Sequence, residues 1–290
     1  MHSWPPITMA ESIVRGAVMT VVSASVAMML IPLAEWMTGI TTDITLLELA
    51  DPSRPLLRRL ATEAPGTYAH SVAMASLCEQ ACNAIGANGL LARIGCYYHD
   101  VGKLVQPKYF VENQVTRINP HDQLPPADSA RVVRSHVVEG LRLGREAGLP
   151  PVVLAFIPEH HGTMYLDYFR DRARQDGTYA NTDDDAYRYP GPRPRSVETA
   201  VTMLADSAEA ALRVLGEPTP ERIRSAIEYL IQQKVEAGQL KEAPLTLSDL
   251  DRVKEEFVQH MTGIYHARVE YPGTSGGIAA LFPTRGAGRG

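Results

Sequence analysis

A stretch of nineteen residues without a charge most constrains how this chain can fold. It runs from Gly16 to Ala34, reads GAVMTVVSASVAMMLIPLA, and lies between Arg15 and Glu35. A helix of this length rises about 28 Å, close to the thickness of the hydrocarbon core of a bilayer. A signal peptide has a shorter apolar run before a small-residue cleavage site. We expect an N-terminal flank at 1–15 and one transmembrane helix at 16–35.

The alternative for this stretch is a buried core helix, because its small residues suit close helix packing in either solvent. The charges around it predict its orientation. Arg15 is the one basic residue of the preceding flank other than the histidine at position 2, whereas Arg54, Arg58 and Arg59 follow the stretch. By the positive-inside rule, the part after the stretch is expected in the cytoplasm.

Helical spacing of apolar residues dominates the chain after the stretch, and the period-two alternation of strands is nearly absent. A juxtamembrane joint is expected at 36–45, a helical core at 46–215, further helices of the same domain at 216–270, and a flexible Gly-rich tail at 271–290. Within these parts, helices are expected near 43–50, 56–63, 67–85, 88–100, 128–147, 151–161, 196–215, 219–237 and 248–266, with Asp128-Ser129 capping the fifth. The predicted fold class is all-α.

Two segments lack this spacing. Val105–Pro126 is rich in Pro, Asn and Asp and is expected to form a long irregular loop. Arg170–Arg195 is polar and charged and is expected to be a surface excursion. Its acidic run, Asp183–Asp185, is expected to be solvated rather than metal-binding.

Charge and cysteine content exclude two classes of function. A net charge of -5 and a pI near 6.0 argue against a protein that binds DNA or RNA polymers through their backbone. Three cysteines, Cys78, Cys82 and Cys96, are too few and odd in number for a disulfide framework. We expect them to be reduced core residues.

Seven residues of metal-ligand type lie on predicted helices or at helix ends. They are His70, His99, Asp100, His136, His160, His161 and Asp206. Each alone is explained by an ordinary core or surface role, but together they are costly to bury unless something binds them. Imidazoles with carboxylates suit iron, manganese, zinc or nickel. Seven ligands exceed one tetrahedral site and fit two adjacent metals sharing a carboxylate, which can activate water for attack on a phosphodiester.

This set resembles the HD superfamily of metal-dependent phosphohydrolases, whose pattern H…HD…D is met here by His70, His99-Asp100 and Asp206. The segments LLELADPSRPLLRRLATEAPGTYAHS, YYHDVGKLVQPKYFVENQ, NPHDQL, EHHGT and RYPGPRPRSVETAVTMLADSAEA resemble the cytoplasmic HD domain of the seven-transmembrane, PgpH-type cyclic di-AMP phosphodiesterases. The resemblance covers about residues 40–265. That family has seven spans and this sequence has one, which fits a fragment, a truncated product or a split protein.

The resemblance implies a function and a ligand set. One metal is expected on His70, His99, Asp100 and Asp206, and the other on His136, His160 and His161, with Asp100 bridging. The implied metals are iron or manganese. The implied catalytic residues are His99, Asp100 and Lys103. The implied reaction is hydrolysis of cyclic di-AMP to 5′-pApA by a protein of the bacterial cytoplasmic membrane with its catalytic domain in the cytoplasm.

Contacts with a cyclic dinucleotide are predicted for the loop after His99-Asp100. Lys103 offers a point charge to a phosphate, with a solvated lysine as the alternative. The other predicted contacts, for stacking and amide recognition of adenine, are Tyr109, Phe110, Asn113 and Gln114. Core packing is the alternative for the two aromatic residues. His121 is expected to make a structural hydrogen bond in the loop.

Two other functions remain open from the sequence. One is an HD phosphohydrolase acting on cyclic di-GMP or ppGpp. The cyclic di-GMP branch carries GYP after its His-His pair, and HHGTMYLDYF here lacks it. The other is a membrane-tethered nucleotide sensor without catalysis, which the presence of all seven residues disfavours. The oligomeric state, including a homodimer, also stays open.

Overall fold

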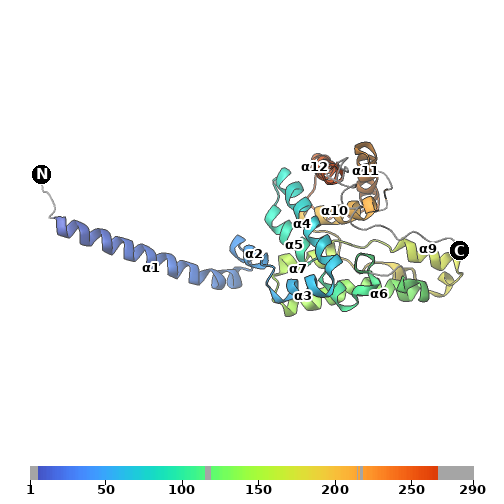
Figure 1. The fold of residues 1–290 in the computed structure, drawn as a ribbon, viewed down its shortest axis with the longest axis horizontal. Coiled ribbons are helices and arrows are strands. Elements are labelled where there is room, and N and C mark those ends of the chain that lie inside the picture. The colour runs from blue at the N-terminus through green and yellow to red at the C-terminus, as the bar shows by residue number, and fades with distance from the viewer. Residues whose placement is uncertain (1–5, 115–118, 214, 216–217, 267–290) are drawn as a thin grey trace, which may run out of the picture. The chain divides into compact units, whose positions relative to one another are not determined.

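The computed structural model describes residues 6–114, 119–213, 215 and 218–266 (Figure 1). The chain divides into two compact units, residues 1–49 and 50–290. The first unit contains α1 (Pro6–Thr38) and α2 (Asp43–Leu49). Within α1, Ile7–Glu35 has a mean hydropathy of 2.1, and none of its most apolar stretch is buried. By length and composition this helix can cross a membrane.

The helix that contains the expected transmembrane stretch 16–35 is longer than that stretch, and the membrane span itself stays a prediction. The helix begins at Pro6, which fits the first position because proline needs no amide donor there, and no breaker lies between Pro6 and Gly16. Glu35 lies in the last turn of α1, which ends at Thr38. Its carboxylate accepts hydrogen bonds from two residues beyond that end, the Thr42 amide (2.7 Å) and the Thr45 hydroxyl (2.8 Å). These bonds fix the turn that leads into α2.

The second unit is all-α in its described residues, as the sequence predicts; one isolated bridge pairs Tyr165 with Arg188. Its α-helices are α3 (Pro55–Glu63), α4 (Pro65–Ala84), α5 (Gly89–Tyr98), α6 (Pro126–Glu146), α7 (Pro151–Leu154), α8 (Phe156–Glu159), α9 (Asp167–Gln175), α10 (Val197–Arg213), α11 (Pro220–Glu236) and α12 (Leu247–His266). Short 3₁₀ helices are η1 (Val101–Val105), η2 (Pro107–Tyr109), η3 (Val111–Asn113), η4 (Pro120–Gln123), η5 (Tyr179–Asn181) and η6 (Asp184–Tyr187).

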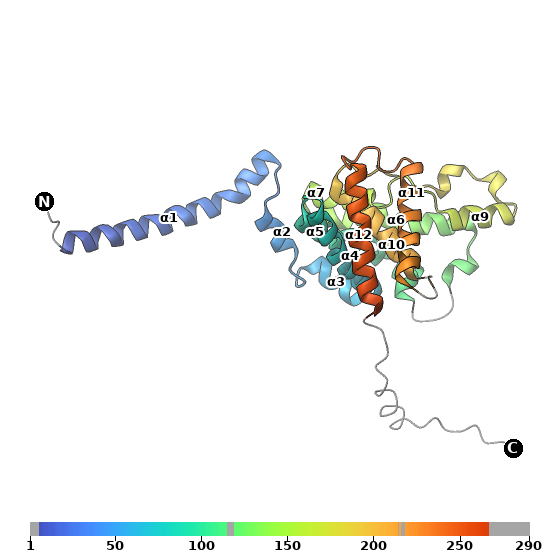
Figure 2. The same ribbon diagram turned by 90° about the horizontal axis from the view of Figure 1, so that it is seen from above.

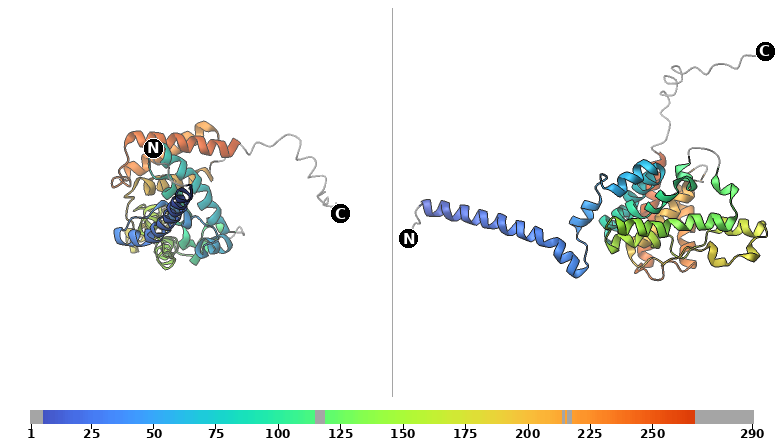
Figure 3. Two further views of the ribbon diagram at one scale, coloured as in Figure 1. Left: turned by 90° about the vertical axis from the view of Figure 1, so that its left-hand side faces the viewer. Right: turned by 90° about the horizontal axis from the view of Figure 1, so that it is seen from below.

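The main core lies between α4, α5 and α10, with α11 and α12 covering one side (Figure 2). Leucine, isoleucine and alanine side chains of these helices fill it, together with Phe257. Cys78, Cys82 and Cys96 are free and fully buried here, so the expectation of reduced core cysteines is confirmed. Along another side of this unit runs α6 as one long helix (Figure 3).

The predicted start of α6 at Asp128-Ser129 is wrong. The helix begins at Pro126, and Pro125 precedes it without a side-chain cap. Proline is favoured at the first helical position because it has no amide hydrogen to satisfy there. Asp128 instead pairs with Arg131 at 2.7 Å, and Ser129 is buried.

The two segments predicted as irregular are more ordered than expected. Val105–Pro126 contains η2, η3 and η4 and buries Phe110 and His121; residues 115–118 lie outside the described residues. The predicted surface excursion, Arg170–Arg195, contains most of α9 and buries four of its described residues, of which Pro194 is one. Ala173 and Tyr187 form a small core with Ala130 and Phe169, and Tyr189 is buried as well. The predicted tail at 271–290 also lies outside the described residues.

A close backbone approach at Gly102 joins η1 to α6. A Cβ atom at Gly102 would overlap the carbonyl oxygen of His136 and lie 2.5 Å from the amide nitrogen of Gly140. Only glycine allows the two backbones to meet at this separation. The approach brings the end of α5, which carries His99-Asp100, beside the middle of α6.

We expect Gly102→Ala to lower the free energy of unfolding by about 1–3 kcal/mol, because the backbones of η1 and α6 must separate. The matched control is Gly263→Ala in α12, where no described atom lies within 4 Å of the new Cβ. That change should be neutral or stabilise by up to about 1 kcal/mol. Denaturant unfolding of the purified proteins measures both; equal stability of the two variants would contradict the close approach.

Candidate metal centre

The structure brings all seven predicted polar residues to one place in the second unit. They come from five parts of the chain: His70 from α4, His99 and Asp100 from the end of α5, His136 from α6, His160 and His161 from the end of α8, and Asp206 from α10. Asp100 and all the histidines except His161 are buried, and His161 is partly exposed. The site therefore depends on the packing of helices far apart in sequence.

Asp100 lies at the middle of the cluster. Its Oδ2 atom is 3.2 Å from His99 Nε2 and 3.8 Å from His70 Nε2. Its Oδ1 atom is 3.5 Å from His136 Nε2 and 3.6 Å from His160 Nε2. One carboxylate oxygen thus faces each of two histidine groups. The ligand atoms of His70, His99 and Asp100 lie within 4.8 Å of one another, as do those of Asp100, His136, His160 and His161.

Asp206 lies between the same two groups. Its Oδ1 atom is 3.3 Å from His70 Nε2, and its Oδ2 atom is 3.9 Å from His161 Nδ1. The sequence places Asp206 with the first group alone, and the structure shows its second oxygen turned toward a residue of the other group. Two carboxylates, rather than one, therefore connect the two groups.

Three imidazoles are oriented by backbone carbonyls one turn earlier. Nδ1 of His99 lies 2.7 Å from the Cys96 carbonyl, that of His136 lies 2.5 Å from the Val133 carbonyl, and that of His160 lies 3.0 Å from the Phe156 carbonyl. A carbonyl can only accept, so each Nδ1 carries a hydrogen and donates it. The lone pair of each neutral ring is then on Nε2, which faces Asp100.

These residues fit bound metal ions. Five buried atoms at the centre have no hydrogen-bond partner: Asp100 Oδ1 and the Nε2 atoms of His70, His99, His136 and His160. Buried polar atoms without partners are rare and costly, and here they converge on a common space. Imidazole nitrogens with carboxylate oxygens are the donor set of first-row transition metals. Metal coordination would satisfy all five atoms.

Burial and the charges at the centre set the protonation state of each donor. Burial alone would raise the pKa of Asp100, but Lys103 and His99 hold it well below its usual value. Burial lowers the pKa of His160 to about 3, and nearby His99 lowers it further, so this imidazole is neutral. Burial also lowers the pKa of His136. Asp100 as a carboxylate and the neutral rings of His136 and His160 are thus available without loss of protons. Burial would lower the pKa of His70 and His99 as well, but Asp206 raises that of His70 to about 10 and Asp100 raises that of His99, so metal binding at these two rings would release protons.

Lys103 lies within the centre rather than in solvent. Its Nζ atom is 2.7 Å from Asp100 Oδ2 and 2.7 Å from Glu112 Oε1. Burial would lower the pKa of Lys103, but these two carboxylates raise it above the usual value. The lysine is therefore charged and compensates Asp100. Its predicted contact with a substrate phosphate requires it to share or exchange these partners.

The other predicted substrate contacts are engaged within the protein. Phe110 is buried and meets the His136 ring edge-on at 5.7 Å. Asn113 donates from Nδ2 to the Thr67 hydroxyl at 2.8 Å, and Gln114 donates from Nε2 to the Lys108 carbonyl at 3.2 Å. Tyr109 is partly exposed. Their roles toward a nucleotide stay predictions.

The predicted structural role of His121 agrees with its contacts. Its Nε2 atom lies 3.0 Å from the Tyr109 carbonyl, and its ring packs 5.1 Å from the ring of Phe169. Arg172 donates to its backbone carbonyl at 3.0 Å. His121 therefore connects the loop after η1 with α9.

Several residues around the centre were not predicted from the sequence. Glu112 binds both Lys103 and the Thr67 hydroxyl, and Tyr189 stacks on His161 with ring centroids 4.1 Å apart. Lys234 on α11 has no side-chain hydrogen bond or ion pair within the described part of the chain. Burial lowers its pKa, against the opposing effect of Asp206. Glu112 and Tyr189 reach the centre from parts of the chain that are distant in sequence, which spacing does not reveal.

Comparison with known proteins agrees with this geometry. The family model of the HD domain matches residues 67–211, which contain all seven residues of the cluster. The chain belongs to the HD-domain family. The crystal structure of the Listeria monocytogenes phosphodiesterase PgpH HD domain in complex with cyclic di-AMP is 39% identical, with a TM-score of 0.71. That match covers 74% of this chain and all of the other.

Two curated relatives of this HD-domain chain carry the same name. This chain is 43% identical over 257 residues to the cyclic di-AMP phosphodiesterase PgpH of Bacillus subtilis, and the match covers 89% of this chain and 36% of that protein. It is 40% identical to PgpH of Listeria monocytogenes, covering 83% of this chain and 33% of that protein. The chain therefore spans about a third of the length of the curated relatives it matches.

We expect manganese or ferrous iron to raise the melting temperature of the chelator-treated protein. Metal at a hundred times its dissociation constant stabilises the folded state by about 2.7 kcal/mol per site. Asp100→Ala should remove most of this rise, because both groups use that carboxylate. The control is Asp185→Ala, which removes an exposed carboxylate elsewhere. A full rise in Asp100→Ala, measured by thermal unfolding, would contradict the shared role.

Proposed function

We propose that this chain is a membrane-anchored phosphodiesterase that uses two divalent metals to hydrolyse cyclic di-AMP to 5′-pApA. The observation that carries the proposal is the carboxylate of Asp100, which turns one oxygen toward each of two histidine groups. A site built around a shared carboxylate is the arrangement that two-metal hydrolysis of phosphodiesters needs. Relatives that share the HD domain are named as cyclic di-AMP phosphodiesterases, which supports the choice of substrate.

The residues of the centre divide into two ligand sets. His70, His99 and Asp206 would hold one metal and His136, His160 and His161 the other, with Asp100 between them. When bound, iron or manganese would supply Lewis acidity and a hydroxide nucleophile at neutral pH. In the overall reaction, water adds to one phosphorus, the bond from that phosphorus to the 3′ oxygen breaks, and the 3′ oxygen takes up a proton. The product is a linear dinucleotide with a 5′-phosphate.

The protein's own side chains prepare the site for this substrate. Lys103 places a fixed positive charge beside Asp100, which offsets the negative charge that a phosphodiester brings. Phe110 and Tyr189 lie against His136 and His161 and limit the access of bulk water to these ligands. Water exclusion strengthens every electrostatic interaction in the site.

Incubation of the purified chain with cyclic di-AMP and manganese or ferrous iron should yield 5′-pApA, measured by chromatography of the products. Asp100→Ala should abolish turnover, because it removes the carboxylate common to both ligand sets. A panel of cyclic di-GMP and ppGpp tests other nucleotide substrates. Cleavage of one of these in preference to cyclic di-AMP would overturn the substrate, and tight binding without cleavage under any metal would indicate a sensor.

The first unit supports anchoring in a membrane. The apolar part of α1 is fully exposed and long enough to span the hydrocarbon core, and water would be a poor solvent for it. The basic residues that follow it in sequence favour a cytoplasmic location for the HD domain. We accordingly propose the bacterial cytoplasmic membrane as the location.

On expression in bacteria, the full chain should sediment with membranes and resist extraction by alkaline carbonate. Residues 40–290, which lack α1, should stay in the supernatant and serve as the control. The physical reason is the transfer of the apolar side chains of α1 into lipid. Recovery of the full chain in the supernatant, without aggregation, would exclude the anchor.

A further inference from the structure

His70 differs from the other buried histidines in what its outer nitrogen meets. Among the residues that the structure describes, no backbone carbonyl makes a hydrogen bond with His70 Nδ1. Instead Glu209 Oε2 lies 3.4 Å away and Arg213 Nη2 also lies 3.4 Å away. Both residues belong to α10, the helix that carries Asp206. The outer side of this ring therefore meets one acceptor and one donor.

A single ring nitrogen cannot satisfy both neighbours. If Nδ1 carries a hydrogen it can bond only to Glu209, and if it carries a lone pair it can bond only to Arg213. The Nε2 atom of the same ring is buried and unpartnered at the centre, 3.3 Å from Asp206 Oδ1. A neutral ring that offers the lone pair of Nε2 to a metal must carry its hydrogen on Nδ1. The partner of Nδ1 is then Glu209.

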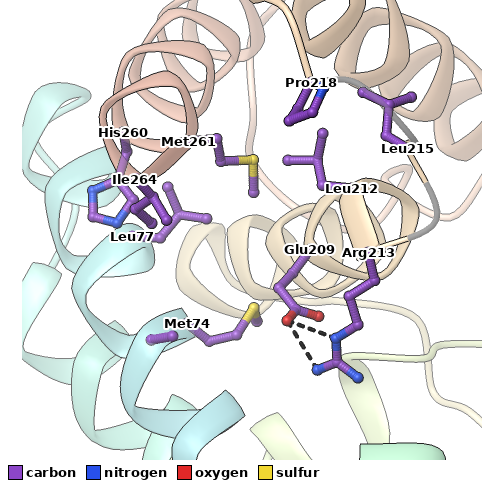
Figure 4. Close-up of a pocket in the computed structure, with 11 residues that line it drawn as sticks. Met74, Leu77, Glu209, Leu212, Arg213, Leu215, Pro218, His260, Met261 and Ile264 are labelled. Atoms are coloured by element: carbon purple, nitrogen blue, oxygen red, sulfur yellow. Dashed lines mark hydrogen bonds and ion pairs between the residues drawn. The ribbon is translucent and has the colours of Figure 1, made fainter. Parts of the chain in front are cut away.

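Arg213 has a separate role in this arrangement. Its Nε and Nη2 atoms both lie 2.9 Å from Glu209 Oε1 (Figure 4). The other carboxylate oxygen of Glu209 faces His70. The guanidinium thus holds the carboxylate in place and keeps it ionised. Burial would raise the pKa of Glu209, but His70 and Arg213 lower it below its usual value.

We propose that Glu209 is a positioning residue that fixes the tautomer and orientation of His70 for one of the two metals. It acts as the carboxylate of a carboxylate–histidine–metal triad, in which the outer acceptor raises the basicity of the ligand. This inference rests on the proposed function, since it requires a metal at His70. It assigns to a side chain the role that backbone carbonyls have for His99, His136 and His160.

The surroundings of Glu209 allow the inference to be tested without rebuilding the core. Glu209 and Arg213 lie at a cavity of about 720 Å³, whose other walls include Met74, Leu212 and Met261 (Figure 4). The side chain of Glu209 is 26% exposed. Its removal therefore lets water reach Nδ1 of His70 instead of leaving an empty space in a packed interior.

The test compares Glu209→Ala, Glu209→Gln and Glu255→Ala in the full chain purified in detergent. Glu255 pairs with Arg224 on the surface, which makes its removal a matched control for loss of a carboxylate–guanidinium pair. Manganese per chain and its apparent dissociation constants are measured by competition with a chelator, and folding is checked by circular dichroism.

The wild type and Glu255→Ala should each bind two manganese ions, and the affinity for each ion should be the same in the two proteins. Glu209→Ala should lower the affinity for one of the two ions by about tenfold to a hundredfold and leave the affinity for the other unchanged. Glu209→Gln should lie between wild type and Glu209→Ala, because its amide oxygen still accepts from Nδ1 without a full charge.

Wild-type affinity for both ions in either folded Glu209 variant would overturn the positioning role and leave the proposed function standing. Should Glu209→Ala fail to fold, the same criterion applied to Glu209→Gln decides. An equal loss of affinity for both ions would also overturn the inference, because it would indicate a general disturbance of α10. Absence of manganese from the wild type would instead contradict the proposed function.

Discussion

The buried negative charge of Asp100 is the constraint on which the rest of this structure depends. A carboxylate with 1% of its surface exposed is unstable inside a protein unless opposite charge or donors surround it. Lys103 supplies one positive charge at 2.7 Å, but it reaches only Oδ2. Oδ1 is left without a hydrogen-bond donor while two imidazole Nε2 atoms face it. The helices thus assemble a site whose unpaired polar atoms bound cations can satisfy.

Helical periodicity and residue type were sufficient to predict the fold class and the seven residues of the cluster. His99-Asp100 and His160-His161 stand beside glycines at the ends of apolar segments, a position visible in the sequence alone. Helix starts were less predictable: Pro126, rather than Asp128, begins α6, because proline fits the first helical position, where its missing amide hydrogen costs nothing. The buried residues of the 170–195 segment were missed because charged side chains surround them in the sequence, and some of these pack over aromatic rings, as Arg174 does over Tyr179 at 4.8 Å.

The contacts around the cluster were beyond prediction from spacing for a physical reason. Glu112 binds Lys103 and Thr67, and Thr67 lies 45 residues away from it, so the contact exists only after the loop folds back onto α4. Glu209 is different, because it follows Asp206 by three residues and shares its face of α10. That spacing was a local signal for a second carboxylate near the cluster, and it points to the outer side of His70.

The two ligand groups differ in how their imidazoles are held, and this difference has a consequence for metal binding. His136 and His160 are oriented by carbonyls of their own helices, which cannot move without unwinding a turn. His70 is oriented by side chains of another helix, Glu209 with Arg213, beside an open cavity. Side chains at 26% and 38% exposure change conformation more readily than buried backbone. The group that contains His70 is therefore the one whose metal affinity should respond to its surroundings, while the other group stays rigid.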